Sequence, residues 1–254
     1  MLFLSNLIRL EKPTKAIKNR EEKMIHKNEL SRKTGGDTLS DIILGGQDGL
    51  VNVLGVLLGV AAASNNIKIV IAGGLAATFA ESISMAAVAL TSKMAERDHF
   101  ISELEREKKE VKEMPGREAD EIRYVYKKKG FEGKILNDIV KHVTANQELW
   151  LNSMMTEELE LKKVEQKDIY RGTWIVGVSA LVGSFVPITP YFFLLMKTAL
   201  IVTLIFSVIV LFLIGAYKAK YTVGKPFKSG LQMVLIGMSA AIAGYLIGRL
   251  FGAK

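Results

Sequence analysis

The chain has 254 residues, of which 49% are hydrophobic, and it carries a formal net charge of +8 and no cysteine. The missing thiols exclude disulfides and thiolate metal sites, which leaves carboxylate, imidazole, thioether and carbonyl groups as ligands for any metal ion. A basic chain can bind nucleic acid. Here, however, the basic residues lie beside apolar runs and no aromatic-basic RNA-binding motif occurs, so we expect no nucleic-acid partner. The charge is better explained as a signal of membrane topology.

The first 40 residues combine a short apolar start with a basic remainder, and nine of them are lysine or arginine. The apolar part precedes the positive charges and no small-residue cleavage site follows, which argues against a secretory signal peptide. Two interpretations stay open. The segment either lies on the cytoplasmic membrane surface as an amphipathic helix or forms a disordered basic tail.

Five apolar segments are long enough, or nearly so, to cross a bilayer: residues 41–63, 67–92, 173–190, 192–216 and 230–251. They predict an all-α membrane protein with five transmembrane helices. The connections at 64–66 and 187–190 contain no lysine or arginine, whereas residues 217–229 contain four. The positive-inside rule then places the amino terminus, residues 93–171 and the 217–229 loop in the cytoplasm, and the carboxyl terminus on the opposite side.

Residues 93–171 are polar and too numerous for a simple connector. Their pattern is helical, and breaks at Pro115-Gly116 and Lys129-Gly130 predict about three helices. No spacer follows Leu90, so we expect the second span to continue directly into the first of these helices. The predicted organisation is a basic amino-terminal segment (1–40), two spans (41–92), a cytoplasmic helical metal-binding domain (93–171) and three further spans (172–254).

Polar side chains interrupt the first two spans. Asp48 and Asn52 lie one helical turn apart in the first span, and Glu81 and Met85 lie one turn apart in the second. A carboxylate at membrane depth costs about 2.5–3.5 kcal/mol even on a lenient scale, so it normally faces a bundle interior or a water-filled path. Asp48 reaching water from a helix end would explain its presence without transport, and the small residues around Glu81 fit close helix packing. The other interpretation is an ion path in which two carboxylates and the Met85 thioether suit Fe(II) or another first-row divalent ion.

The cytoplasmic segment is dense in carboxylates at spacings of three, four and seven residues, which place them on one stripe of a helix. They are Glu96, Glu103, Glu107 and Glu110 before the Pro-Gly break, and Glu118 and Glu121 after it. The later stretch NSMMTEELEL adds Met154, Met155, Glu157 and Glu158. A solvated face neutralised by nearby lysines and arginines is the ordinary explanation of such a charge run. A bound metal ion that relieves the repulsion is the alternative.

Other chemistries find little support in the sequence. The histidines, His26, His99 and His142, form no metal-binding pair on a helix, and the glycine pairs in the spans lack a phosphate-binding pattern. Glu96 and His99 have the spacing of a di-iron ligand pair, but no second copy exists. We therefore predict neither an enzyme nor an ATP-driven pump.

Four features occur in order along the chain: DGLVNVLGVLLGVAAA, AESISMAAVALTSKMAERDHFISELEREKKEV, the spacing of Pro115, Glu118 and Glu121, and WLNSMMTEELEL. Together they resemble the vacuolar iron transporter family, and the resemblance runs from about residue 38 to the end. It implies a homodimer with five membrane helices per protomer and a three-helix cytoplasmic metal-binding domain between the second and third spans. Members of that family move Fe(II), and sometimes Mn(II), out of the cytosol in exchange for protons.

The resemblance also implies roles for particular residues. Asp48 and Met85 would line the transport path at the dimer interface, and we add Glu81 and Asn52 to that path. The cytoplasmic metal site would consist of Glu107, Glu110, Glu118, Glu121, Met154 and Glu158, with Glu103, Met155 and Glu157 as further candidate ligands. Where relatives carry a carboxylate, this chain has Ala77 and Ala89.

The predicted function is therefore export of Fe(II) or Mn(II) coupled to proton antiport, with no tightly bound cofactor. The expected partners are the metal ion, protons, membrane lipid and a second copy of the chain. A membrane-anchored metal sensor or storage accessory without translocation is the alternative. The polar residues within the spans argue against it, because an anchor needs none.

Overall fold

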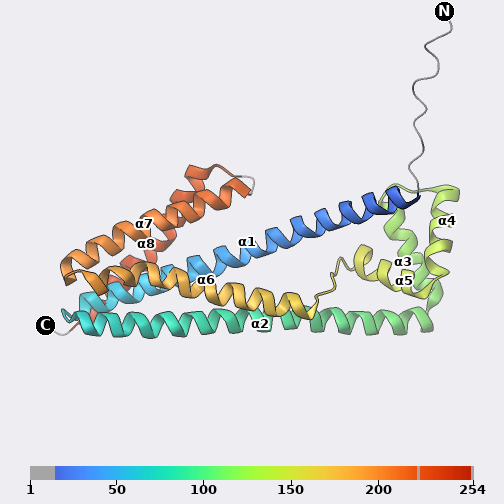
Figure 1. The fold of residues 1–254 in the computed structure, drawn as a ribbon. Coiled ribbons are helices and arrows are strands. Elements are labelled where there is room, and N and C mark those ends of the chain that lie inside the picture. The colour runs from blue at the N-terminus through green and yellow to red at the C-terminus, as the bar shows by residue number, and fades with distance from the viewer. Residues whose placement is uncertain (1–14, 222–223, 253–254) are drawn as a thin grey trace, which may run out of the picture.

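The computed structural model describes residues 15–221 and 224–252, which form helices joined by short connections (Figure 1). In chain order these are α1 (Lys15–Ala63), α2 (Ile67–Glu113), α3 (Pro115–Lys128), α4 (Gly133–Thr144), α5 (Gln147–Ser153), the π-helical turn η1 (Met154–Glu158), α6 (Gln166–Phe193), α7 (Met196–Tyr221) and α8 (Pro226–Phe251). Five helices are long and apolar enough to cross a membrane: α1 from Gly36, α2, α6, α7 and α8. The five predicted spans are thus confirmed.

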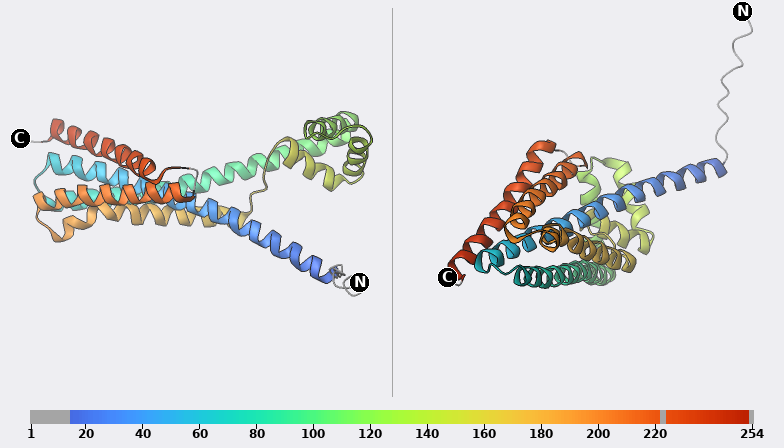
Figure 2. Two further views of the ribbon diagram at one scale, coloured as in Figure 1. Left: turned by 90° about the horizontal axis from the view of Figure 1, so that it is seen from above. Right: turned by 60° about the vertical axis from the view of Figure 1, so that its left-hand side comes forward.

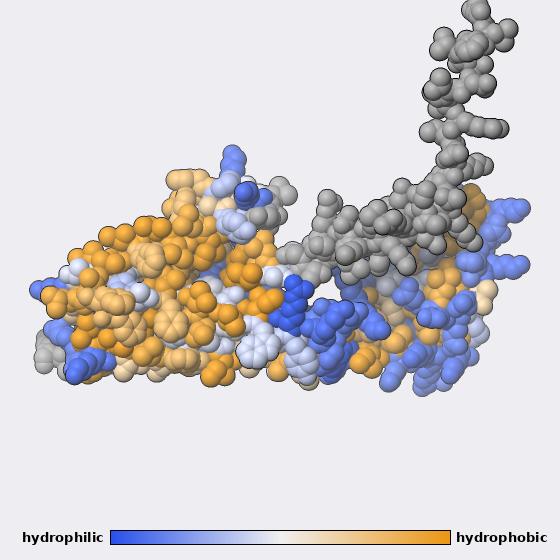
Figure 3. Space-filling model, in the orientation of Figure 1, coloured by the Kyte–Doolittle hydropathy of each residue, from blue (hydrophilic) through white to orange (hydrophobic). Residues whose placement is uncertain are grey.

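The molecule has an apolar end and a polar end (Figure 3). The apolar end contains the five spans, and the polar end is residues 93–165, which we call the insert. The two are joined by α2, a single helix of 47 residues that extends over roughly 70 Å at 1.5 Å per residue. The prediction that the second span continues straight into the polar segment is correct. The carboxyl end of α8 lies against the end of α1 at Ala63, far from the insert (Figure 2).

Within the apolar end, α1 lies between α6 and α8, and glycines allow these backbones to approach closely. A Cβ atom added at Gly183 of α6 would overlap the carbonyl oxygen of Gly46, and one added at Gly248 of α8 would overlap that of Gly59. Small residues at such crossings are typical of membrane helices, because packing rather than the hydrophobic effect holds the helices together in lipid. The backbone of α1 is therefore in close contact with both neighbours.

The connection predicted at residues 187–190 is wrong. Pro187 and Pro190 lie inside α6, which continues to Phe193, and the chain turns only at Leu194. A proline removes one helical N–H donor, but its fixed φ is compatible with a helix, and these prolines come in its last two turns. The hydroxyl of Thr203 in α7 donates to the Pro187 carbonyl oxygen at 2.9 Å, which ties the two helices together at this point.

The first span also begins earlier than residue 41. The helical backbone that carries it continues towards the amino terminus as far as Lys15. Of the segment 1–40, for which an amphipathic helix and a disordered tail were both considered, residues 1–14 lie outside the described residues. The remainder of that segment is helical and continuous with the first span.

The contact between α6 and α1 gives a test of the fold. Replacing Gly183 with valine should lower the melting temperature by about 2–12 °C. Overpacking typically costs about 1–3 kcal/mol, and in a chain of this size each kcal/mol shifts the melting temperature by about 2–4 °C. Thermal unfolding in detergent measures the change. Gly116→Ala is the matched control, since no atom lies within 4 Å of a Cβ added there. Equal melting temperatures for the two variants would contradict the close helix contact.

Candidate functional site

Three polar side chains meet inside the apolar part of the α1–α2 hairpin. Asp48 lies about 22 Å along α1 from its end at Ala63, and Glu81 lies about 21 Å along α2 from its start at Ile67, so both are at the same depth. Asn52 Nδ2 donates to Asp48 Oδ2 at 3.3 Å. The Glu81 carboxyl group is in hydrogen-bonding contact with Asp48 and Asn52. A hydrogen bond between two carboxyl groups needs a shared proton, and a cation can replace that proton.

This intramembrane cluster is open on one side of the protomer. Asp48 and Glu81 are half-buried, whereas Asn52 is exposed, and Val56 one turn further along α1 is 41% exposed. Glycines that contact α6 and α8 flank this exposed stripe, since Gly45 and Gly59 lie seven residues before and after Asn52 on the same side of α1. Polar groups thus reach an outer surface of the apolar end.

Two adjoining cavities lie between this cluster and the insert. The first, of about 200 Å³, is lined by Met85, Asp41 and Glu96 among others, and Ala89 also lines it. The second, of about 380 Å³, shares Asp41 and Glu96 with the first and extends between α1, α2 and α6. Lys93 lines both. Met85 therefore lies one helical turn nearer to the insert than Glu81, beside a cavity that the sequence did not reveal.

A second carboxylate cluster lies in the insert, where α2 reverses into α3. Pro115 occupies the first position of α3, where its missing N–H costs nothing. The reversal brings Glu107 and Glu110 of α2 together with Glu118 of α3, and one carboxylate oxygen from each lies within 4.8 Å of the others. Such a group of oxygens can hold a divalent cation.

The carboxylates of this cluster are buried and poorly compensated. Glu118 is fully buried, and neither of its oxygens has a hydrogen-bond partner; Glu107 Oε2 and Glu158 Oε2 also lack one. Burial, reinforced by the neighbouring carboxylates, raises the pKa of Glu118 and of Glu158 to about 7. Burial also raises the pKa of Glu107, although Arg106 opposes the shift. The ion-free cluster therefore holds protons at neutral pH.

The π-helical turn η1 completes the cluster. Its wider turn, closed by a hydrogen bond of 3.1 Å from Leu159 N–H to the Met154 carbonyl oxygen, buries the side chains of Met154 and Met155. It also brings Glu158 into hydrogen-bonding contact with Glu121 of α3. Single π turns of this kind are frequent at functional sites. The turn thus adds the Glu158 carboxyl group to those of α2 and α3 and buries two thioethers on the same element.

Two predicted ligands lie apart from the buried oxygens. Glu157 is exposed and forms an ion pair with Lys129. Glu103 lies at the edge of the cluster, where its carboxylate accepts from Arg106 at 2.9 Å. Arg106 is one of the nearby basic residues expected to neutralise the carboxylate stripe, and it contacts several of these carboxylates at once.

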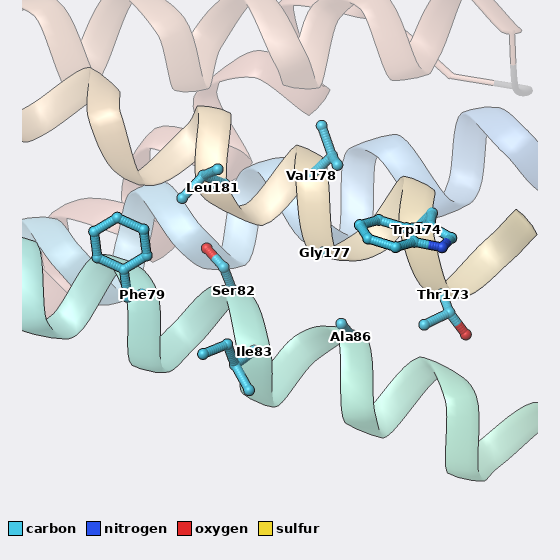
Figure 4. A pocket seen from close by; sticks show the side chains of 9 residues that line it. All are labelled: Phe79, Ser82, Ile83, Ala86, Thr173, Trp174, Gly177, Val178 and Leu181. Carbon is cyan, nitrogen blue, oxygen red and sulfur yellow. The ribbon is translucent and has the colours of Figure 1, made fainter. Parts of the chain in front are cut away.

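A further pocket, of about 320 Å³, lies between α2 and α6 (Figure 4). Phe79 and Ile83 of α2 and Trp174 and Val178 of α6 form much of its wall. The hydroxyl of Ser82 in this pocket donates to its own helix backbone at 2.7 Å, which leaves the lining apolar. This groove suits the apolar surroundings of a membrane span and offers no metal ligands.

These features define a class: a multi-pass α-helical membrane protein whose second span carries a carboxylate-rich insert. Residues 39–249 match the VIT family, and the chain belongs to this family, whose members are transporters rather than enzymes.

Several relatives of the chain match it over most of their length. Vacuolar iron transporter 1 of Tulipa gesneriana is 30% identical over 229 residues, which cover 90% of this chain and 93% of the relative. Vacuolar iron transporter 1 of Arabidopsis thaliana is 28% identical over 217 residues, with coverage of 85% and 87%. The vacuolar iron transporter of Plasmodium falciparum (isolate 3D7) is 29% identical over 222 residues, with coverage of 84% and 81%.

The raised pKa values make the stability of the insert depend on pH. In the folded chain the pKa of Glu118 is about 7, whereas its ordinary value is 4.5, so the folded state binds more protons than the unfolded state between these values. Stability should be greatest below pH 4.5, fall as the pH rises, and level off above pH 7. Hydrogen exchange of α3 in metal-free protein at pH 5.5 and 8 measures this loss.

Glu118→Gln should flatten this pH dependence, because glutamine stays neutral throughout the range. Glu113→Gln, at an exposed carboxylate on the same hairpin, is the control and should keep the parent profile. A Glu118→Gln profile parallel to that of the parent would show that Glu118 does not titrate as described.

Proposed function

We propose that this chain carries Fe(II), and to a lesser extent Mn(II), out of the cytosol across a membrane in exchange for protons. The observation that carries the proposal is the contact between Asp48 and Glu81 at mid-membrane depth in a chain of the VIT family. The curated relatives are named as iron transporters, which supports iron as the cargo. From the basic segments we infer that the insert and the amino terminus lie in the cytoplasm, and the carboxyl terminus on the opposite side.

The intramembrane pair supplies the coupling. A divalent cation needs both Asp48 and Glu81 ionised, so a proton that the two carboxyl groups share would leave when the metal binds. Release of the metal on the far side allows the pair to take up a proton again. The thioether of Met85 on the approach tolerates Fe(II) or Mn(II) and offers little to Ca(II).

The cluster in the insert acts as a collecting site rather than as part of the membrane path. Glu107 lies about 39 Å along α2 from Glu81, so an ion leaves one site before it reaches the other. Buried carboxylates attract the divalent ion, and Met154 and Met155 bias the site towards Fe(II). The two junction cavities, which Asp41 and Glu96 line, lie between the sites.

A second copy of the chain is needed to close the path. Asn52 and Asp48 reach the exposed face of α1, and polar groups of this kind are costly in lipid. A two-fold partner that packs against this face would cover them and make the path a channel between protomers. We therefore propose a homodimer with α1 at its interface.

Replacing Asp48 with asparagine tests the transport mechanism. Fe(II) uptake into proteoliposomes that carry a pH gradient should be abolished, because the amide cannot alternate between a proton and a metal ion. Metal binding by the insert should be unchanged. Asp138→Asn, at an exposed carboxylate of α4, is the control and should transport normally.

The same assay distinguishes transport from the alternative function. A membrane-anchored sensor or storage accessory would bind metal without any uptake by the parent protein. Undiminished uptake by Asp48→Asn would instead contradict the proposed role of this carboxylate, although the proposal that the chain transports metal would stand.

The proposed interface can be tested with single cysteines, because the natural chain has none. Val56→Cys lies on the exposed face of α1 and should form a disulfide-linked dimer under mild oxidation in membranes. Leu213→Cys, 59% exposed on α7, is the control and should stay monomeric on a denaturing gel. Cross-linking of the second variant but not of the first would place the interface elsewhere.

A further inference from the structure

Arg106 contacts three of the carboxylates in the insert. Its Nη2 atom lies 2.9 Å from Glu103 Oε2 and 2.9 Å from Glu107 Oε1, and its Nη1 atom lies 3.6 Å from Glu110 Oε2. A guanidinium group remains charged at all relevant pH values. One fixed positive charge thus partly compensates a group of carboxylates that would otherwise repel one another.

The two carboxylate oxygens of Glu107 have different surroundings. Its Oε1 atom pairs with Arg106, whereas its Oε2 atom is buried without a partner in the cluster that includes Glu118. The Arg106 side chain is 48% exposed and that of Glu107 only 3%, so the guanidinium covers the solvent side of the cluster. A long, half-exposed side chain can move into water without disturbing the core.

We propose that Arg106 is a built-in competitor of the metal ion. It holds Glu107 and Glu110 in the ion-free state and leaves them when a divalent cation binds. The inference rests on the proposed function of the insert as a collecting site. A guanidinium and a divalent ion compete for the negative charge of the same carboxylates and repel each other at short range. Arg106 therefore keeps the affinity low enough for the ion to move on to the membrane path.

Two other cations on the hairpin help to isolate this effect. Lys109 pairs at 4.0 Å with Glu113, which lies outside the cluster. Arg117 pairs with Glu121 at 3.1 Å. Removing the charge of Lys109 changes the general field around the insert but breaks no contact with Glu107 or Glu110, so Lys109→Gln is the matched control.

The test is Mn(II) binding to the full-length protein in detergent at pH 7, followed by the electron paramagnetic resonance of free Mn(II). Arg106→Gln should tighten the dissociation constant at least tenfold. Arg106→Lys should tighten it less, because a lysine keeps the charge but loses the fork that spans two carboxylates. Lys109→Gln should change it less than twofold. An unchanged or weaker affinity of Arg106→Gln would overturn the inference.

A Glu118→Gln variant distinguishes failure of the inference from failure of the proposed function. If the parent protein binds Mn(II) and Glu118→Gln weakens this binding, the collecting site exists, and the Arg106 variants alone decide the competitor role. If the parent does not bind, or Glu118→Gln has no effect, the collecting site and the inference that depends on it both fail.

Thermal unfolding and transport provide readouts that a merely structural role would not reproduce. Arg106→Gln should lower the melting temperature of the metal-free protein but enlarge the shift that Mn(II) causes. It should also lower both the half-saturating metal concentration and the maximal rate of uptake, because the ion binds more tightly and leaves more slowly. A smaller metal-induced shift would mean that Arg106 positions the ligands, which contradicts competition.

Discussion

The structure depends on one constraint: a carboxyl group inside an apolar bundle must have polar partners close to it. The α1–α2 hairpin meets this constraint through its lengths, because the short turn after Ala63 brings Asp48 and Glu81 to the same depth. Glycines in α1, α6 and α8 allow those backbones to approach closely. The placing of the two acids and the close packing of α6 and α8 on α1 thus depend on different residues of the same helix.

In the insert, to which α2 also contributes, the electrostatic problem is repulsion between carboxylates. Its carboxylates lie outside the apolar end, yet the α2–α3 reversal and the π turn bury several of them together. Their oxygens have too few donors, as the unpartnered atoms of Glu107, Glu118 and Glu158 show. Like charges that are held this close favour protonation or a bound cation. The carboxylates of the folded insert therefore need a compensating positive charge, which the residues of the insert supply only in part.

Much of this arrangement could be predicted from the sequence, because it depends on period and length. The five spans, the continuous α2 and the glutamate stripe all follow from spacing along a helix. The π turn could not be predicted, because it changes the helical phase locally and thereby separates exposed Glu157 from half-buried Glu158. The course of α6 through Pro187 was missed for another reason: a proline is compatible with the last turns of a helix, so composition alone misplaced the end. The junction cavities depend on how α1, α2 and α6 meet, which no single segment encodes.

The two sites share a principle that explains how an ion could pass between them over about 39 Å along α2. In each, we propose that a positive charge holds the place of the metal in the ion-free state: a proton at the contact of Asp48 with Glu81, and the guanidinium of Arg106 beside Glu107 and Glu110. A resident cation stabilises the ion-free state, so the free energy of metal binding is reduced by the work of displacing it. The ion can move from one site to the next only if both sites bind it weakly, because an ion held by uncompensated carboxylates would stay at the first site it reached. The difference between the two is informative. A proton leaves the intramembrane pair altogether and can be exchanged across the membrane, whereas the guanidinium is tethered and returns to the cluster once the ion has left.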